Sequence, residues 1–344
     1  MLKQAGLSIV ELMIAMTLSL LLGLGIFQVF TSNQQSARMT QALVHIQDSG
    51  RLALDMMARD IRNADYWGCA GGLDRVSSTI DTGNPQYDEG AHGFGQANLP
   101  GLNAGDNVAA GVEFGGLEVR PGTDFLELRG LSSMGLSIAQ AMPLTSAALF
   151  VTDNEGFQQD DILAVSDCQS ADVFQVTNFN AAGGGSSGFN VVHNAGNSIP
   201  GNTTQNLSRR YPVGAQILLP VYRVYFINVQ NGVSRLMMRD ESGTTSVLID
   251  HVEDMQLVFG VDINGSGTID QFMTGTEIVN DASVDYDDVL SVDVTLRLAS
   301  PQTNVIETGI EYAWNDNQPL DAAEDLGRLR RQLSTVASVR SRTQ

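Results

Sequence analysis

The chain has 344 residues, 43% of them hydrophobic, which is enough for one large domain or two small ones. Its formal net charge is −20, so it offers no basic stripe to nucleic acid, and we expect no nucleic-acid partner. Lys3 is the only lysine, and this excludes a P-loop and a Schiff-base site. The 35 glycines and few aromatic residues favour a loop-rich β protein.

Catalytic motifs are missing from the sequence. The four histidines are far apart, none lies in HExxH or beside a CxxC, and no GxSxG is present. "GGGSSG" at 183–188 fits G-x-G-x-x-G, but the following "FNVVH" predicts a strand and not a helix, so a flexible loop is favoured. We therefore predict no enzymatic activity and no required cofactor.

The first predicted element is an apolar helix over residues 7–30. Glu11 is the only charge in these 24 residues, a length that crosses a bilayer with some tilt. A conventional signal peptide would have a small-x-small cleavage site after the apolar run, and "QVFTSNQQSAR" offers none. We expect the apolar segment to be retained in the protein.

An amphipathic pattern continues directly from the apolar run. Gly50 fills one gap in a helical stripe of apolar residues, and most charged residues lie outside it. The stripe consists of Met39, Leu43, Ile46, Ala53, Met57, Ile61 and Ala64. We predict one continuous helix of about 55 to 60 residues, roughly 80–90 Å long, which ends around Asp65–Gly68. The alternative is an independent surface helix over the second stretch.

Short β-rich runs follow the helix, separated by turns such as "QNG" and "ESG" that favour antiparallel pairing. The predicted strands are Asp124–Arg129, Leu149–Thr152, Ile162–Ser166, Val173–Thr177, Phe189–His193, Ile217–Val229, Val233–Arg239, Val247–Ile249, Met255–Val261, Val289–Leu298 and Asn304–Trp314. Residues 82–123 and 178–211 are predicted to be long surface loops. The apolar spacing of Leu329–Arg340 fits a last strand or a short helix.

The N-terminal motif Gly6-Leu7-Ser8-Ile9-Val10-Glu11 resembles that of type IV prepilins. In that family a prepilin peptidase cleaves after the glycine and methylates the new N-terminal amine. The resemblance implies that the mature chain begins at Leu7, where phenylalanine is commoner. The family fold is a long N-terminal helix packed on an antiparallel β-sheet, which implies an α+β fold here.

The resemblance also gives Glu11 a role in assembly. An ionised carboxylate costs about 2.5–3.5 kcal/mol at the centre of a membrane and is retained where it finds a partner. In pilins that partner is thought to be the N-terminal amine of a neighbouring subunit, here Leu7. The alternative is that Glu11 lies solvated at the depth of the lipid headgroups.

Further segments are similar to the PilW group of minor pilins. They are "DYWGCAG" (65–71), "ILAVSDCQSADVFQVT" (162–177), "HVEDMQLVFGVDINGSG" (251–267) and the pattern at Arg330–Arg331 and Val336–Arg340. Such pilins assemble with PilV-, PilX-, PilE- and FimU-like subunits into a tip complex that primes polymerisation of the major pilin and carries a large adhesin-like protein. This resemblance covers about half of the chain.

The implied organisation has four parts: a leader (1–6), a transmembrane half of the helix (7–30), an amphipathic half (31–67) and a β-rich domain (68–344). The implied location is the bacterial inner membrane, with the C-terminal domain in the periplasm, and the pilus tip. In such an exported domain we expect Cys69 and Cys168, the only cysteines, to form a disulfide. The alternative is two buried free thiols.

"DINGSGTID" at 262–270 is similar to the first nine positions of a calcium loop. The oxygen donors would be Asp262, Asn264, Ser266, the Thr268 carbonyl and Asp270. The closing acid is missing, because Met273 is at the twelfth position; Glu277 or an acid of "DYDD" (285–288) would have to replace it. The alternative is a tight Asn-Gly hairpin turn with acidic neighbours.

Taken together, these patterns predict a minor pilin that helps to initiate a type IV pilus. One alternative is a J-type minor pseudopilin of a type II secretion system, which shares the leader and the fold. A less favoured alternative is a membrane-anchored periplasmic binding module or enzyme, whose site would lie in the long loops.

Overall fold

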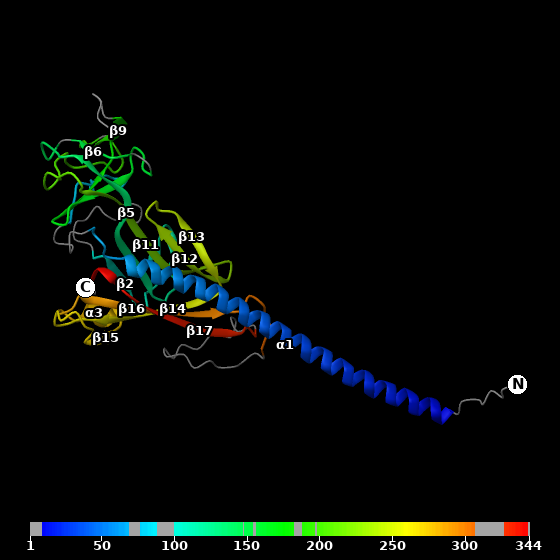
Figure 1. Ribbon diagram of the computed structural model, residues 1–344. Helices are drawn as coiled ribbons and strands as arrows, with labels where there is room; N and C mark the ends of the chain where they lie inside the picture. The colour runs from blue at the N-terminus through cyan, green and yellow to red at the C-terminus, as the bar shows by residue number, and fades with distance from the viewer. Residues whose placement is uncertain are drawn as a thin grey trace. The chain divides into compact units, whose positions relative to one another are not determined.

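The computed structural model describes residues 9–68, 76–87, 100–146, 148–153, 156–181, 188–196, 198–306 and 327–342 (Figure 1). The chain divides into two compact units. The first comprises residues 1–49 and 299–331, and the second comprises residues 50–298 and 332–344.

Helix α1 (Ile9–Asn63) is one continuous helix of 55 residues, as the sequence predicts. It ends where Asp65 takes a left-handed conformation with φ of +59°. The N–H of Asp65 donates to the carbonyl of Arg129 at 2.8 Å, so the chain leaves the helix directly onto a strand of the sheet.

The predicted apolar stripe is confirmed over most of its length. Six residues of the stripe are buried: Ile46, Gly50, Ala53, Met57, Ile61 and Ala64. Met39, by contrast, is 40% exposed, and Leu43 is half-buried, so the prediction was wrong at its N-terminal end. Ala42, Leu54 and Ala58 widen the buried face, as expected for a helix that packs on a broad surface and not along a narrow seam.

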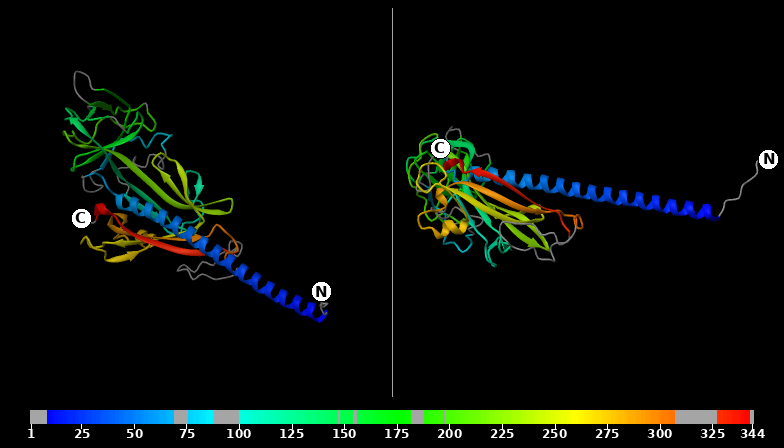
Figure 2. Two further views of the ribbon diagram at one scale, coloured as in Figure 1. Left: turned by 45° about the vertical axis from the view of Figure 1, so that its right-hand side comes forward. Right: turned by 90° about the horizontal axis from the view of Figure 1, so that it is seen from below.

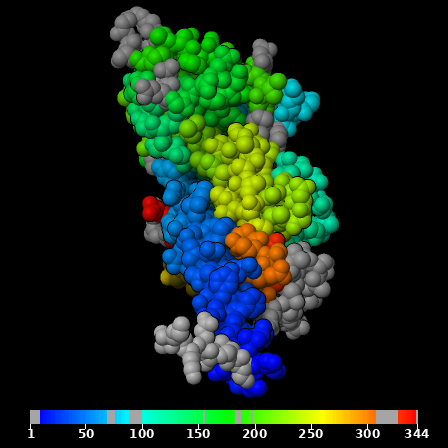
Figure 3. All heavy atoms as spheres, turned by 90° about the vertical axis from the view of Figure 1, so that its right-hand side faces the viewer, coloured from blue at the N-terminus to red at the C-terminus, as the bar shows by residue number. Residues whose placement is uncertain are grey.

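The larger sheet has eleven strands and is built around β11 (Gln216–Gln230), which pairs with β5 (Phe125–Gln140), β7 (Ile162–Ser166) and β12 (Val233–Asp240). The remaining strands are β1 (Val76–Ser78), β2 (Leu102–Gly105), β6 (Leu149–Val151), β8 (Ala171–Gln175), β9 (Asn178–Ala181), β10 (Phe189–Val192) and β13 (Thr245–Asp250). The outer strand of the β12–β13 hairpin is open to solvent, as the yellow-green surface in Figure 3 shows.

This sheet buries both faces where β7 and β8 lie. Ala164 and Val173 pack in one hydrophobic cluster with Trp67 and Tyr222. The alternate residues Leu163, Val165 and Phe174 pack in a second cluster with Ile217. Because successive side chains of a strand point to opposite faces, two cores explain why almost every residue of these strands is buried.

The smaller sheet has four strands in the order β15 (Gln271–Met273), β14 (Val252–Val261), β16 (Val289–Ala299) and β17 (Arg330–Ser338). Strands β16 and β17 lie side by side in both views of Figure 2. The predicted alternation of β16 is confirmed, because Val292, Val294, Leu296 and Leu298 are all buried on one face. The segment Leu329–Arg340, predicted as a last strand or a short helix, contains the strand β17. Helix α3 (Gly275–Asn280) and the 3₁₀ turns η2 (Tyr286–Asp288) and η3 (Arg340–Arg342) flank this sheet.

Several predictions of local structure were wrong. The predicted loop 82–123 contains β2 and a small hairpin of β3 (Glu113–Phe114) and β4 (Leu117–Glu118), and the predicted loop 178–211 contains β9. Strand β10 confirms the strand predicted at Phe189–His193. Residues 304–306 are bends where a strand was expected, and residues 307–314 of that predicted strand lie outside the described residues. Strands β1 and β8 are parallel, so the sheet is mixed. The missed strands β2, β3, β4 and β9 have only two to four residues each, too few for alternation to reveal them in turn-rich segments.

Candidate functional site

The first half of α1 is the least buried part of the described chain. Its large apolar side chains from Ile9 to Phe30 are each more than half exposed, and none of its most apolar window is buried. The mean hydropathy of that window is 2.2, and its length suffices to cross a bilayer. The Thr17 hydroxyl donates to the backbone carbonyls of Met13 and Ile14 at 3.0 and 2.9 Å, so this polar group has hydrogen-bond partners within the apolar helix.

Glu11 lies in the first turn of the described helix, where the helix dipole favours a negative charge. The predicted cleavage and methylation residues, Gly6 and Leu7, lie outside the described residues. The geometry of cleavage therefore stays a prediction, together with the assembly role of Glu11.

The second half of α1 is held close to the smaller sheet at Gly50. A Cβ atom built on Gly50 would lie 2.5 Å from Leu333 Cδ1 and 3.2 Å from Leu298 Cδ2. No side chain larger than hydrogen fits there without movement of the two leucines. The glycine that leaves a gap in the apolar stripe thus lies at a point of close approach between helix and strands.

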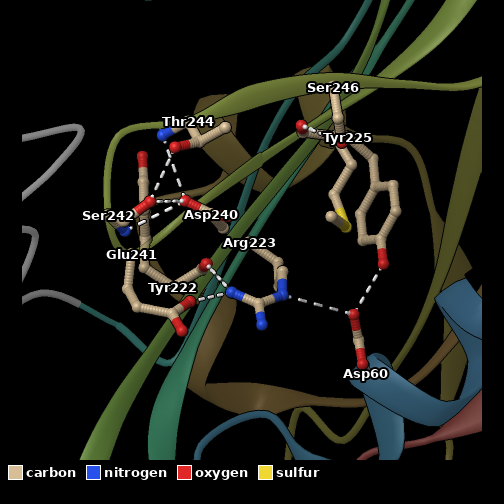
Figure 4. A network of polar contacts seen from close by, with 10 residues as sticks. Asp60, Tyr222, Arg223, Tyr225, Asp240, Glu241, Ser242, Thr244 and Ser246 are labelled. Carbon is tan, nitrogen blue, oxygen red and sulfur yellow. Dashed lines mark hydrogen bonds and ion pairs between the residues drawn. The ribbon is translucent and has the colours of Figure 1, made fainter.

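A network of polar contacts joins the last turns of α1 to the larger sheet (Figure 4). Tyr225 Oη donates to Asp60 Oδ2 at 2.6 Å, and Arg223 Nε lies 3.9 Å from the same carboxylate. Arg223 also donates to the Tyr222 carbonyl at 2.8 Å and pairs with Glu241. Burial, together with the negative charge of Asp60, raises the pKa of Tyr225 above its usual range, so the phenol stays a hydrogen-bond donor.

A polar hollow opens beside this network, between the end of α1 and strands β5 and β11. Its volume is about 360 Å³, and its lining includes Asp60, Tyr66, Arg129, Ser132 and Arg223. Arg129 is buried and lies 3.3 Å from Glu127, which also accepts a hydrogen bond from Tyr222 at 2.6 Å. Both arginines and the one acid that line the hollow, Arg129, Arg223 and Asp60, are therefore engaged in contacts with other side chains of the protein.

The C-terminus clamps the end of the same helix. Arg342 Nε lies 2.6 Å from Asp65 Oδ2, and its NH2 lies 3.3 Å from Asp287 Oδ1. Its NH1 donates to the carbonyls of Tyr286 and Val289, so one guanidinium joins the helix end, η2 and β16. Ser341 Oγ adds a bond to the Ala64 carbonyl at 3.0 Å. Arg342 is not among the residues predicted from the sequence, although the tail is rich in arginine.

Cys168 lies in the tight turn between β7 and β8, in a left-handed conformation with φ of +65°. Its predicted partner, Cys69, lies outside the described residues, so their pairing stays a prediction. The neighbouring residues are in contact, however. Ser166 Oγ donates to the Trp67 carbonyl at 3.3 Å, and a Cβ on Gly68 would lie 2.6 Å from that same hydroxyl.

The 262–270 loop closes through its own hydrogen bonds. Asp262 Oδ1 accepts from Ser266 N at 3.0 Å and its Oδ2 accepts from Gly267 N at 2.6 Å. Asp270 accepts from Ile263 N at 3.0 Å and from Asn264 Nδ2 at 2.9 Å. Burial acts to raise the pKa of Asp262, but the loop N–H groups outweigh it and lower that pKa. The loop joins β14 to β15 as an antiparallel hairpin.

The side chains proposed to close a calcium site have other contacts. Glu277 Oε2 accepts from Thr274 N at 2.8 Å in the capping box of α3, and Met273 is buried in β15. Asp285 and Asp288 cap η2. Among the described residues, no group of three or more His, Cys, Asp or Glu side chains is arranged to hold a metal. Calcium binding by the mixed oxygen donors stays a prediction.

Two buried carboxylates were missed by the reading of the sequence. Asp124, directly before β5, accepts from Asn107 N at 2.8 Å in the loop after β2 and from Leu257 N at 2.7 Å in β14. Burial raises its pKa to about 7 against the opposing effect of these two donors. Asp172 accepts from Ser208 and Tyr211 and is fully buried. Nothing in a sequence separates such an aspartate from one in an exposed turn.

The described fold is thus a long N-terminal helix with an unburied apolar half, followed by a β-rich part with one mixed and one antiparallel larger sheet. Residues 224–341 match the family described as "Type IV Pilus-assembly protein W", which confirms the predicted resemblance over this stretch. The matched stretch includes β12, β13 and all four strands of the smaller sheet.

Comparison with solved structures finds a type IV-like pilin from Thermus thermophilus. It is 13% identical, with 54% of this chain and 86% of that chain covered, and its TM-score is 0.18. A TM-score of this size does not establish a shared fold, so the architecture rests on the helix and sheets described above. No curated protein matches the chain.

Proposed function

We propose that the protein is a minor pilin that takes part in type IV pilus assembly within a complex that primes the filament at its tip. The observation that carries this proposal is the division of one continuous helix into two halves. The first half exposes its apolar side chains on every side, and the second half buries a stripe. A lipid bilayer or the helices of other subunits would cover the first half.

In this proposal a prepilin peptidase cleaves between Gly6 and Leu7 and methylates the new amine. Cleavage removes Lys3 and makes the acidic chain one charge more negative. The amine of a neighbouring subunit's Leu7 would then offer Glu11 a partner of opposite charge in the filament core. An opposite charge in an apolar setting offsets the cost of an ionised carboxylate there.

The proposed location is the inner membrane before assembly, with residues 68–344 in the periplasm, and the pilus tip afterwards. The proposed partners are the major pilin, the PilV-, PilX-, PilE- and FimU-like minor pilins and a large tip adhesin-like protein. The match of residues 224–341 to a pilus-assembly family supports this setting.

The test is a gene deletion followed by complementation and a count of surface pili. We expect few pili in the deletion strain, recovery with the unaltered gene and defective recovery with Glu11→Ala. Asp55→Ala is the matched control, because Asp55 is an exposed acid on the second half of the same helix. Immunoblots should show equal amounts of each variant. Normal piliation of the deletion strain would overturn the initiator role.

The same strains distinguish the rival function, a J-type pseudopilin of a type II secretion system. Secretion of exoproteins should persist in the deletion strain if the protein serves a pilus. Loss of secretion with normal pili would favour the pseudopilin.

A further inference from the structure

One face of the smaller sheet carries exposed apolar side chains at its β15 end. Phe272 of β15 is paired across the strands with Gly260 of β14, which is in turn paired with Ser291 of β16. Cross-strand partners share a face, so Phe272 lies on the side to which a Gly260 side chain would point. A Cβ on Gly260 would lie 2.7 Å from Ile269 Cδ1, which places Ile269 on that side too.

Val258 extends this face by one more position, since it is two residues from Gly260 on the same strand. We call Val258, Ile269 and Phe272, with Gly260 between them, the β15 face. Phe272 is 62% exposed, and Val258 and Ile269 are 37% and 41% exposed. The opposite face is different, because the neighbours Phe259 and Met273 are 0% and 5% exposed in the core.

The β15 face also covers polar atoms that have no hydrogen-bond partner among the described residues. They are Ser291 Oγ and Asp293 Oδ1, and Asp293 is the cross-strand partner of Val258. Ser291 as a whole is 5% exposed. A buried hydroxyl without a hydrogen-bond partner destabilises the fold. When another surface covers the apolar side chains above it, their removal from water favours association.

The segment that carries most of the β15 face is rich in acids. Residues 262–288 contain seven acids and no lysine, arginine or histidine. Asp270 is two residues from Phe272, Glu277 caps α3, and Asp293 lies opposite Val258. Protein–protein interfaces commonly have apolar residues at the centre and polar or charged residues around them.

We propose that the β15 face docks a different protein, one that presents an apolar side chain ringed by lysine or arginine. A second copy of this chain would place this acidic segment against its own copy, and like charges placed together oppose association. The chain has 19 basic residues against 39 acidic ones and a net charge of −20, so it is a poor source of basic surface for its own copy. An anionic membrane surface is disfavoured by the same repulsion.

The test is photocrosslinking in cells that express the full chain with p-benzoylphenylalanine at position 272. We expect one discrete adduct with a different protein, attached through a segment that contains lysine or arginine. The double variant Glu277→Gln with Asp293→Asn should weaken the adduct several-fold, because glutamine keeps the cap of α3 while two charges are lost. The pair Glu113→Gln with Glu118→Gln, on the β3–β4 hairpin, is the charge-matched control and should leave the adduct unchanged.

The captured protein, once purified, allows the apolar contact to be measured. Phe272→Ala in the full chain should weaken binding about tenfold or more. Leu144→Ala should leave it unchanged, because Leu144 is 64% exposed in a different part of the protein. No adduct, an adduct with a second copy, an adduct through an acidic segment, or equal binding by the two variants would overturn the proposal. The count of pili tests the proposed function separately.

Discussion

Gly50 shows how one residue decides how closely a helix approaches a sheet. The space at its Cα is already filled by Leu333 and Leu298, so any added carbon must displace them. Interiors are close-packed, and such displacement costs typically about 1–3 kcal/mol.

We predict that Gly50→Ala lowers the free energy of unfolding by about 1–3 kcal/mol, although alanine is the better helix former. Urea unfolding of the detergent-solubilised full chain, followed by circular dichroism, measures this. Gly23→Ala is the matched control, since nothing lies within 4 Å of a Cβ there. Equal or greater stability of the Gly50 variant would show that the leucines yield without cost.

Asp124 makes stability depend on pH. Its pKa in the folded chain is about 7, whereas an aspartate in an unfolded chain titrates near pH 3.9. Between these values the folded chain holds a proton that the unfolded chain has lost. Linkage then requires the free energy of unfolding to fall as pH rises from about 4 to 7. Asp287, whose burial raises its pKa to about 6, acts in the same direction.

We expect the titration of Asp124 to lower the free energy of unfolding by up to about 4 kcal/mol as pH rises over this range. Asp124→Asn should flatten the pH profile, and it should also lower stability at acidic pH, since the amide NH₂ cannot accept from the second backbone N–H. Denaturant unfolding at half-unit pH steps measures both effects. Asp48→Asn, an exposed site on α1, should leave the slope unaltered. An unchanged slope in the Asp124 variant would contradict the prediction.

At the scale of elements, the segment after α1 and the β7–β8 turn are already in contact through Gly68, Trp67 and Ser166. The predicted bond between Cys69 and Cys168 would fix this contact covalently. It would close a loop of about 100 residues, worth roughly 4–5 kcal/mol in the chain-entropy model.

We predict that Cys168→Ser destabilises the exported protein by several kcal/mol, up to the roughly 4–5 kcal/mol of that model. Adding reductant should lower the free energy of unfolding of the unaltered chain by the same amount. It should leave the free energy of unfolding of the variant unchanged. Mass spectrometry that finds both thiols free in protein from the periplasm would rule the pairing out.

The β14–β15 loop is an element with two interpretations, a hairpin turn closed by its own N–H groups and a calcium loop. If calcium binds, calorimetry of the full chain should show heat at up to millimolar calcium, since extracellular sites bind at about 10⁻⁴–10⁻³ M. Asp262→Asn should then abolish the heat, while Asp81→Asn, in another turn, should not. No heat in the unaltered chain would leave the loop as a turn.

At the scale of the whole molecule, the apolar half of α1 is long and apolar enough to cross a bilayer. We predict that the protein remains in the membrane pellet after alkaline carbonate extraction. Leu21→Arg should release part of it, because an arginine at the centre of a span costs about 2.5–3.5 kcal/mol on insertion scales. Leu52→Arg, on the exposed side of the second half, should stay in the pellet. Equal extraction of the two variants would show that residues 7–30 do not anchor the chain.

Periodicity explains which parts of the fold could be predicted. The apolar stripe with a period of 3.6 residues predicted α1 and its end near Asp65, and alternation with a period of two residues predicted β16. The turn sequence "QNG" predicted the β11–β12 hairpin. Asn231 and Gly232 both have positive φ, as a two-residue hairpin turn requires. These features are encoded within a few consecutive residues.

The sequence by itself determined the division of the helix, the acidity and the family resemblance, because each depends on local residue types and their spacing. Only the tertiary structure decided which polar residues meet. Asp60 joins Tyr225, Arg342 joins Asp65, and Asp124 joins Leu257, over separations of more than a hundred residues. The β15 face also appears only on folding, since pairing in register is what places Phe272, Ile269 and Val258 on one side of a sheet.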